Sequence, residues 1–361
     1  MKLLKIKKIY TLALPAFLLL LFTLPANAVN ENAVNWQLAQ SWSKDTPVFG
    51  DAVKRLVENV GILSNGEFTI EIVSKETHQR PLGIFNMVRE NQYQMGHGSS
   101  DFWKDSDANT LLLSALPMEM IAIEQYGWFY HDDGMELMQK VFKKHGLLAF
   151  PGGNTGNQMG GWFKKEIKSI EDLKGLKIHT SGLAGNVMES FGAEISTLQD
   201  NEIYDALKND KLDAVEWVGP SLDLGMNLHE LAVYYYTGWQ EPGTELQFVV
   251  NESAFNELPK HFQDILIKSM RLAAYDTYIQ AYHDSAKNLR IMKAVIPNLS
   301  IRAFPLPVYR ALVKESARQL EKIANEGDDL SKEILKPRKD YIEFSRIWTR
   351  FSDQAFLNNQ F

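Results

Sequence analysis

The chain has 361 residues and a formal net charge of -7 at pH 7, and it contains no cysteine. An acidic chain without a run of basic residues offers no electrostatic basis for binding nucleic acid. The lack of cysteine excludes disulfides, thiolate catalysis and cysteine-ligated metals, so the 45% of hydrophobic residues must supply the core, and the length predicts two domains.

The N-terminal 28 residues have the three parts of a secretory signal. Four lysines within residues 2–8 precede an apolar stretch, which ends near Ala26-Asn27-Ala28, an A-x-A cleavage site. We predict a signal peptide over 1–28 and a mature chain that begins at Val29. Its loss removes four lysines and no acids, which changes the net charge from -7 to -11. The alternative is an uncleaved single-span anchor, for which the apolar stretch is short.

Strand and helix patterns alternate along the mature chain. Apolar and polar residues alternate in strands at 36–42 and 68–74, with a helical pattern at 47–66 between them. Further helices are predicted at 84–90, 121–130 and 135–145, and further strands at 94–98 and 147–153. This order predicts a mainly parallel sheet with helices on both faces, the α/β class.

The same order repeats in the next segment. Strands are predicted at 162–167, 176–178 and 213–219, helices at 184–191 and 201–210, and an additional strand at 247–251. Residues 258–295 form a helical pattern far longer than a typical globular helix, and the segment from 307 onwards is helical. We interpret this as two lobes with a long helix that braces both.

The common catalytic signatures are absent. The sequence contains no G-x-S-x-G, H-E-x-x-H, G-x-G-x-x-G or Walker motif, and its eight histidines never fall at i, i+4 spacing. We therefore predict that the protein is not an enzyme.

Residues 150–167, FPGGNTGNQMGGWFKKEI, combine five glycines with neutral hydrogen-bonding side chains between two apolar strands. Bare backbone of this kind suits close approach to a ligand. An ordinary glycine-rich connection, with Gln158 in solvent, is the alternative.

Glu216 and Trp217 lie in an apolar strand that stops at Gly219-Pro220. Burial of a glutamate in such a strand is costly unless the carboxylate is paired or binds a metal. The alternative is that strict alternation places Glu216 on a solvent-exposed face of the strand. His179 ends the strand in LKGLKIHTSG, and pattern alone leaves it as a metal ligand, a general base, a ligand contact or a space-filling residue.

Taken together and in this order, GNTGNQMGGWFKKEI, DLKGLKI, DAVEWVGP and GWQEPG are specific. From about Trp36 onwards the chain resembles the DctP-like periplasmic solute-binding proteins of TRAP (tripartite ATP-independent periplasmic) transporters, within the 2-oxo acid and pyruvate branch. The resemblance implies a two-lobed clamp in the periplasm that closes on a small solute and delivers it to the membrane subunits of a permease. It assigns 29–153 and 242–275 to lobe I, 154–241 and 290–330 to lobe II, 258–295 to the bridging helix and 331–361 to a C-terminal helical extension.

The resemblance also implies one Na⁺ or Ca²⁺ that bridges protein and solute. By position, its ligands are the Gln158 side-chain oxygen, the Glu216 carboxylate and the Trp217 main-chain carbonyl, which are hard oxygen donors. The residues implied to contact the solute are Gln158, His179, Trp217, Asn154, Asp101, Phe102, Trp239 and Glu241.

The sequence departs from the family pattern at two places. The family has an arginine that forks onto the substrate carboxylate where this chain has His179, and the loop at Asp101 and Phe102 has lost an aromatic pair. We therefore expect a solute other than a simple 2-oxo monocarboxylate: one that is less acidic, larger or amine-bearing. The alternative is a conventional 2-oxo or hydroxy acid read by a protonated His179, held by Asp101 or by the solute.

Residues 332–361 resemble the extra C-terminal helix by which some members of this branch form swapped dimers, so a homodimer is expected. Two other classes compete with a transport receptor. One is an exported enzyme with His179 and Glu216 as base and partner, and the other is an orphan receptor for a signalling partner. Neither has a positive feature in the sequence.

Overall fold

The computed structural model describes residues 33–359. The predicted signal peptide at 1–28 lies outside these residues. Within them, none of the helices is both long enough and apolar enough to cross a membrane.

The first lobe is built on a five-stranded sheet with the strand order β2-β1-β3-β10-β4. β1 is parallel to β2 and β3, whereas β10 is antiparallel to β3 and β4. All seven residues of β10 are buried because it lies between two other strands. The strands are β1 (Val34–Gln40), β2 (Phe68–Val73), β3 (Met95–Ser99), β4 (Leu147–Asn154) and β10 (Glu245–Asn251).

Helices cover both faces of this sheet, and their apolar sides form its core. In α1, for example, Ala52, Leu56 and Val60 are buried at helical spacing. The helices of this lobe are α1 (Phe49–Leu63), α2 (Lys75–His78), α3 (Ile84–Arg89), α4 (Ala122–His131), α5 (Gly134–Lys143) and α9 (Glu252–Glu257), with 3₁₀ turns η1 (Ser100–Trp103) and η2 (Ala108–Leu113).

The second lobe has a six-stranded sheet with the order β11-β9-β5-β8-β6-β7. It is mixed, because β5 runs antiparallel to β8 and β9 while the other pairs are parallel. The strands are β5 (Met159–Phe163), β6 (Lys177–His179), β7 (Glu194–Ser196), β8 (Ala214–Val215), β9 (Tyr234–Thr237) and β11 (Ser300–Arg302). The helices are α6 (Gly182–Ser190), α7 (Asp200–Lys208) and α8 (Pro220–Asp223). The 3₁₀ turns are η3 (Ile170–Leu173), η4 (Leu224–Met226) and η5 (Leu228–Glu230).

One predicted strand is much shorter than expected. The sequence predicts a strand over 213–219, but only Ala214–Val215 pair as β8. The chain leaves the sheet after Val215 because the buried Asp223 carboxylate accepts the main-chain N–H groups of Val218 and Gly219, at 3.2 and 2.8 Å. These two groups are therefore not available to a strand ladder.

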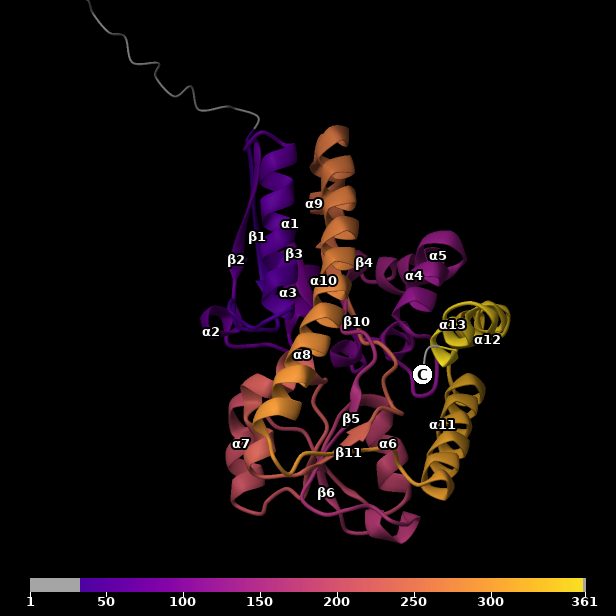
Figure 1. The fold of residues 1–361 in the computed structure, drawn as a ribbon. Helices are drawn as coiled ribbons and strands as arrows, with labels where there is room; N and C mark the ends of the chain where they lie inside the picture. The colour runs from indigo at the N-terminus through magenta and orange to yellow at the C-terminus, as the bar shows by residue number, and fades with distance from the viewer. Residues whose placement is uncertain (1–32, 360–361) are drawn as a thin grey trace, which may run out of the picture.

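The long helix is α10 (Lys260–Val295), of 36 residues, and it spans both lobes (Figure 1). At about 1.5 Å per residue it is about 54 Å long. Leu266 packs in the first lobe, Ala281 in a cluster near the cleft and Met292 in the second lobe. The predicted brace that contacts both lobes is therefore confirmed.

The C-terminal helices lie along one side of the molecule, on the right in Figure 1. α11 (Leu306–Glu326) packs on α6 of the second lobe, and α12 (Asp329–Phe351), followed by α13 (Asp353–Asn358), packs on α4 and α5 of the first lobe. Arg338 of α12 is fully buried, where it donates to Glu119 and to the main-chain oxygen of Leu112. The predicted lobe boundaries stay a prediction.

Candidate ligand-binding cavity

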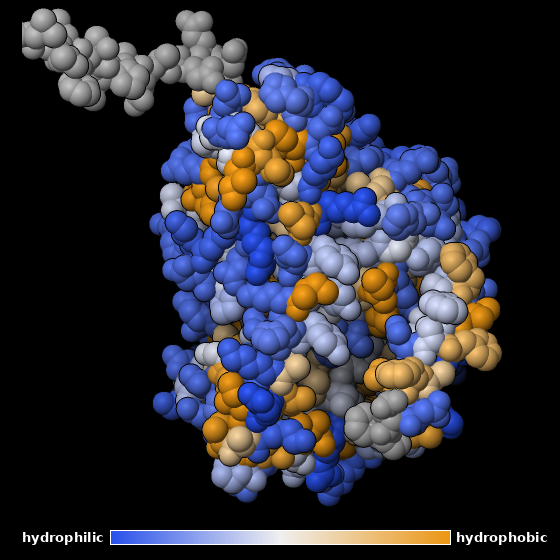
Figure 2. Space-filling model, turned by 45° about the horizontal axis from the view of Figure 1, so that its top comes forward, coloured by the Kyte–Doolittle hydropathy of each residue, from blue (hydrophilic) through white to orange (hydrophobic). Residues whose placement is uncertain are grey.

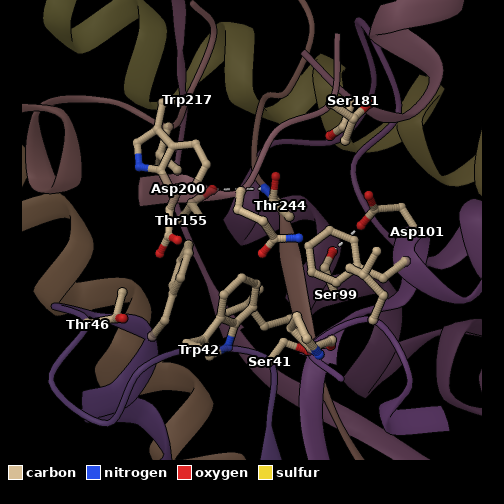
Figure 3. Close-up of a pocket in the computed structure, with 18 of the residues that line it drawn as sticks. Ser41, Trp42, Thr46, Ser99, Asp101, Thr155, Ser181, Asp200, Trp217 and Thr244 are labelled. Carbon is tan, nitrogen blue, oxygen red and sulfur yellow. Dashed lines mark hydrogen bonds between the residues drawn. The ribbon is translucent and has the colours of Figure 1, made fainter. Parts of the chain in front are cut away.

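A cavity of about 400 Å³ lies between the two lobes. Both lobes contribute to it: Trp42 follows β1 of the first lobe, and Trp217 follows β8 of the second (Figure 3). Most of its wall is apolar, and the large apolar side chains are Trp42, Phe49, Leu82, Phe102, Leu198, Trp217 and Leu246. Polar side chains also line it, and several of them, such as Gln158, His179 and Glu216, lie at or next to strand ends, where α/β folds commonly place ligands.

Gln158 lies where the chain first passes from one sheet to the other, between β4 and β5. Its Nε2 donates to the hydroxyls of Thr155 and Thr244 at 3.1 and 2.8 Å. Its Oε1 is buried and, among the described residues, has no hydrogen-bond partner. Gln158 thus lines the cavity with one carbonyl oxygen that is buried and free, and its side chain does not point to solvent.

Glu216 lies directly after β8 and is 7% exposed. Its Oε2 accepts from the Thr180 hydroxyl at 3.2 Å, while Oε1 is buried and unpartnered in the described part of the chain. Burial, together with the nearby Glu241 carboxylate, raises the pKa of Glu216 well above its usual range.

The peptide between Trp217 and Val218 has a defined orientation. Its N–H points to Asp223, because Asp223 Oδ1 accepts from it at 3.2 Å. In a trans peptide the carbonyl oxygen lies on the opposite side from the following N–H. The Trp217 oxygen is therefore directed away from Asp223.

These groups suit a hard cation. Gln158 Oε1, Glu216 Oε1 and the Trp217 oxygen are the donor types that Na⁺ and Ca²⁺ prefer, and two of them are orphaned buried atoms, which are costly without a partner. Within residues 33–359 no cluster of three or more His, Asp or Glu side chains could hold a metal. A cation at this site would therefore be completed by oxygens of the solute.

His179 ends β6 and lines the cavity, 5% exposed. Its Nδ1 accepts from the main-chain N–H of Leu198 at 3.2 Å, so the proton of the neutral ring is on Nε2. Burial lowers the pKa of His179 to about 4, against a smaller opposing effect of the Ser196 main-chain carbonyl. The imidazole is therefore neutral at pH 7.

Asp101 and Glu241 bring two further carboxyl groups to the cavity. Asp101 accepts from the Ser99 hydroxyl (Figure 3), and Glu241 accepts from the Thr244 hydroxyl. Burial raises the pKa of Asp101, and it raises the pKa of Glu241 to about 7. Phe102 also lines the cavity, with its ring centroid 5.7 Å from that of Trp42.

The structure does not bring Asn154 and Trp239 to this cavity. Asn154 is fully buried, and its Nδ2 donates to Gln125 at 2.7 Å and to Glu245 at 3.2 Å. Trp239 packs in the core of the second lobe and borders a separate cavity of about 540 Å³. Both lie near the crossings between the sheets, but neither lines the cavity between the lobes.

Sequence reasoning missed several lining residues. Thr155 and Thr244 flank the two crossings, Thr180 follows β6, and Lys75 forms an ion pair with Asp200 across the cleft at 2.7 Å. The signal for Thr155 was present, since it lies in the glycine-rich segment with Gln158. Nothing in the sequence relates Lys75 to Asp200, because they are 125 positions apart.

Two α/β lobes around a shared cavity, braced by one long helix, define a two-lobed solute-binding protein. Residues 38–326 match the family described as "Bacterial extracellular solute-binding protein, family 7" (DctP). The chain belongs to this family, whose members are solute receptors and not enzymes. The expected family and the expected fold are both confirmed.

Similar proteins of known structure carry a cation and an organic acid. A TRAP periplasmic solute-binding protein from Colwellia psychrerythraea, with bound calcium and pyruvate, is 50% identical, with 91% of this chain and 99% of that chain covered and a TM-score of 0.89. One from Pseudoalteromonas atlantica, with bound sodium and pyruvate, is 48% identical, with 91% and 99% covered and a TM-score of 0.88.

A curated relative has a related description. The monocarboxylate 2-oxoacid-binding periplasmic protein from Nostoc sp. is 32% identical over 326 residues, which are 90% of this chain and 88% of that protein. Membership in a periplasmic solute-binding family implies a periplasmic location and a TRAP permease as partner.

Proposed function

We propose that this protein is a periplasmic receptor that captures a 2-oxo monocarboxylate with an apolar side chain, together with one Na⁺ or Ca²⁺, and delivers it to a TRAP permease. The observation that carries the proposal is the pair of buried, unpartnered oxygens, Gln158 Oε1 and Glu216 Oε1, beside a largely apolar wall. Oxygens of the solute's carboxylate and 2-oxo group would complete the coordination of the cation. The wall would accept the remainder of the solute.

The charges around the cavity support a cation. Asp101, Glu216 and Glu241 all line it, and the single lysine or arginine among its described lining residues, Lys75, is paired with Asp200. Burial raises the pKa of these three carboxyl groups, and a solute carboxylate beside their ionised forms would meet like charge in a poorly solvated space. A cation offsets that repulsion, so the solute does not need a side-chain guanidinium.

His179 then acts as a neutral group. The loss of the family's arginine led us to expect a solute other than a simple 2-oxo acid, or else a protonated His179. We favour the conventional solute with a neutral His179, because burial keeps the imidazole uncharged and Asp101 is hydrogen-bonded to Ser99. The relatives that hold pyruvate with calcium or with sodium support this choice.

Calorimetry on protein freed of metal and ligand tests the proposal. Pyruvate, 2-oxobutyrate, 2-oxoisovalerate, lactate, succinate and an amino alcohol are titrated in Ca²⁺, in Na⁺ and in a buffer without either. We expect the 2-oxo monocarboxylates to bind at least about tenfold more tightly with a cation. Binding of the amino alcohol and of no 2-oxo acid would contradict the proposal and support the solute class expected from His179.

Matched variants make the test specific to the site. Glu216→Gln should abolish the gain in affinity that the cation gives, because it removes the charged ligand at constant size. Glu194→Gln changes an exposed carboxyl of the same lobe and should bind like the unmodified protein. N-terminal sequencing of the exported protein should give Val29 as the first residue if residues 1–28 are a cleaved signal.

We also propose a homodimer that forms through the C-terminal helices. Apolar residues of α12 and α13 are 56 to 80% exposed: Phe344, Ile347, Trp348, Phe351, Phe356 and Leu357. Figure 2 shows apolar surface on the right flank, where Figure 1 places these helices. A second copy of the same face would cover it.

Truncation after residue 331 is a poor test of the dimer, because Ile334 and Arg338 are fully buried against the first lobe. Trp348→Glu combined with Phe351→Glu leaves that inner side intact. Light scattering should give the monomer mass for this variant and the dimer mass for the exposed control Lys332→Glu. An equal mass for both would refute the dimer.

A further inference from the structure

We propose that Thr155 and Thr244 are positioning residues that hold the Gln158 amide with its oxygen free for a cation, and so make the site selective for a cation. This inference rests on the proposed function, because it concerns the cation site named there. Both threonines line the cavity beside Gln158, and Figure 3 shows them close together.

Each threonine hydroxyl has one proton to donate. The Thr155 hydroxyl donates to the main-chain oxygen of Gly156 at 3.1 Å, and the Thr244 hydroxyl donates to Glu241 Oε2. With their protons committed, both hydroxyl oxygens can only accept further hydrogen bonds. They are therefore acceptors at the two positions where they meet Gln158.

An amide has two N–H groups and one carbonyl oxygen. The two N–H groups of Gln158 meet the two hydroxyl acceptors at 3.1 and 2.8 Å. A flipped amide would set its oxygen against two acceptors and lose both hydrogen bonds. It would also replace the free oxygen with an NH₂ group, which cannot coordinate a cation. The free Oε1 is thus a consequence of the threonines.

The threonines come from different parts of the chain. Thr155 follows β4 at the first crossing between the sheets, and Thr244 precedes β10 at the second crossing. The main-chain N–H of Thr244 also donates to Thr155 Oγ1 at 3.0 Å, which ties the crossings together. The orientation of Gln158 therefore depends on both of these crossings, the one between β4 and β5 and the one between β9 and β10.

The test compares Thr244→Val, Thr244→Ser, Thr155→Val and Thr155→Ser with the unmodified protein. Valine has the shape of threonine but cannot accept, whereas serine keeps the hydroxyl. Calorimetry gives the pyruvate affinity with and without Ca²⁺, and the melting temperature without either gives the stability. We expect each valine variant to lose about tenfold or more of its affinity in Ca²⁺ and to change little without Ca²⁺, and each serine variant to retain most of it.

The ratio of the two affinities separates positioning from simple damage to the fold. An equal loss with and without Ca²⁺ in the valine variants, or a serine variant as weak as its valine partner, would overturn the inference. The inference would also be overturned if the ratio of the affinities with and without Ca²⁺ were the same in the valine variants as in the unmodified protein. If one valine variant does not fold, the other carries the comparison, since Thr155 and Thr244 make equivalent contacts to Gln158.

Failure of the proposed function gives a different pattern. If the unmodified protein binds no 2-oxo acid, the comparison is made with Ca²⁺ alone, by the rise in melting temperature. A rise in the unmodified and serine proteins and none in the valine variants supports the positioning role without the proposed solute. No rise in any protein overturns the inference together with the cation site.

Discussion

His97 and His179 are both buried, and burial lowers the pKa of each to about 4, but the two rings have different surroundings. His97 has no exposed surface, accepts from Trp42 Nε1 at 3.2 Å and lies 3.1 Å from the main-chain oxygen of Gly152. His179 lines the cavity. His97 therefore holds Trp42, a residue of the cavity wall, in place by a hydrogen bond, whereas His179 is itself part of that wall.

The His97 environment predicts a pH dependence of stability. Its folded pKa of about 4 lies below the usual 6.5, so the unfolded chain binds more protons between these values. Stability from His97 is present above pH 6.5 and is lost as pH falls towards 4. Compared with His97→Gln, the unmodified protein should lose about 2 kcal/mol of unfolding free energy between pH 8 and pH 5.

Urea unfolding of both proteins at the two pH values checks this prediction. The carboxyls with raised pKa, such as Glu241 and Asp223, act with the opposite sign, since they stabilise the folded chain as pH falls. They are common to both proteins and cancel in the difference. A difference that stays constant with pH would show that His97 does not titrate in this way.

At the scale of elements, the segment after β8 depends on one carboxylate. Asp223 Oδ1 accepts from Val218 and Gly219, while Oδ2 accepts from Trp162 Nε1 at 3.0 Å and from the Tyr235 hydroxyl at 2.8 Å. This fixes the turn that carries Glu216 and Trp217 out of the sheet. It also directs the Trp217 oxygen, a proposed cation ligand, away from Asp223.

Asp223→Ala should therefore affect both stability and binding. It leaves several buried donors unpaired, so we expect the unfolding free energy to fall by about 3 kcal/mol or more. The pyruvate affinity in Ca²⁺ should fall about tenfold, because the Trp217 peptide loses its anchor. Tyr235→Phe is the control: it removes one Oδ2 bond, costs about 1 kcal/mol and should leave the Ca²⁺ effect unchanged. Equal binding losses in the two variants would contradict this account.

The sequence predicts features that depend on local interactions and misses those that depend on residues far apart in the chain. Local periodicity placed a strand at 68–74, observed as Phe68–Val73, and a helix at 258–295, observed as Lys260–Val295. It failed at 213–219, because the capture of two N–H groups by Asp223 is not a periodic signal.

The same limit applies to the cavity. Family resemblance named residues next to strand ends, and the structure brings Gln158, His179, Glu216 and Trp217 to the cavity. Resemblance could not tell that Asn154, four positions from Gln158, turns towards Gln125 and Glu245. The Thr155–Gln158–Thr244 arrangement was also out of reach, because Thr244 is 86 positions from Gln158 and meets it only when both crossings are folded.

At the scale of the whole molecule, one ion pair joins the lobes at the edge of the cavity. Lys75 Nζ of α2 lies 2.8 and 2.7 Å from the two carboxylate oxygens of Asp200 at the start of α7. Their side chains are 21 and 35% exposed, so the pair is partly protected from water and salt. Because the two partners come from different lobes, the pair opposes opening of the cleft.

We predict that removing either partner speeds the release of the solute. Lys75→Met and Asp200→Asn should each raise the dissociation rate of pyruvate by about two- to fivefold at low salt, the range for a partly exposed ion pair. The double variant Lys75→Asp with Asp200→Lys should recover part of this loss. Stopped-flow tryptophan fluorescence can follow release, since Trp42 and Trp217 line the cavity. The Asp200→Asn result decides between two roles of Lys75: if the lysine serves mainly to attract the anion, freeing it from Asp200 would slow release, and the interlobe role would be refuted.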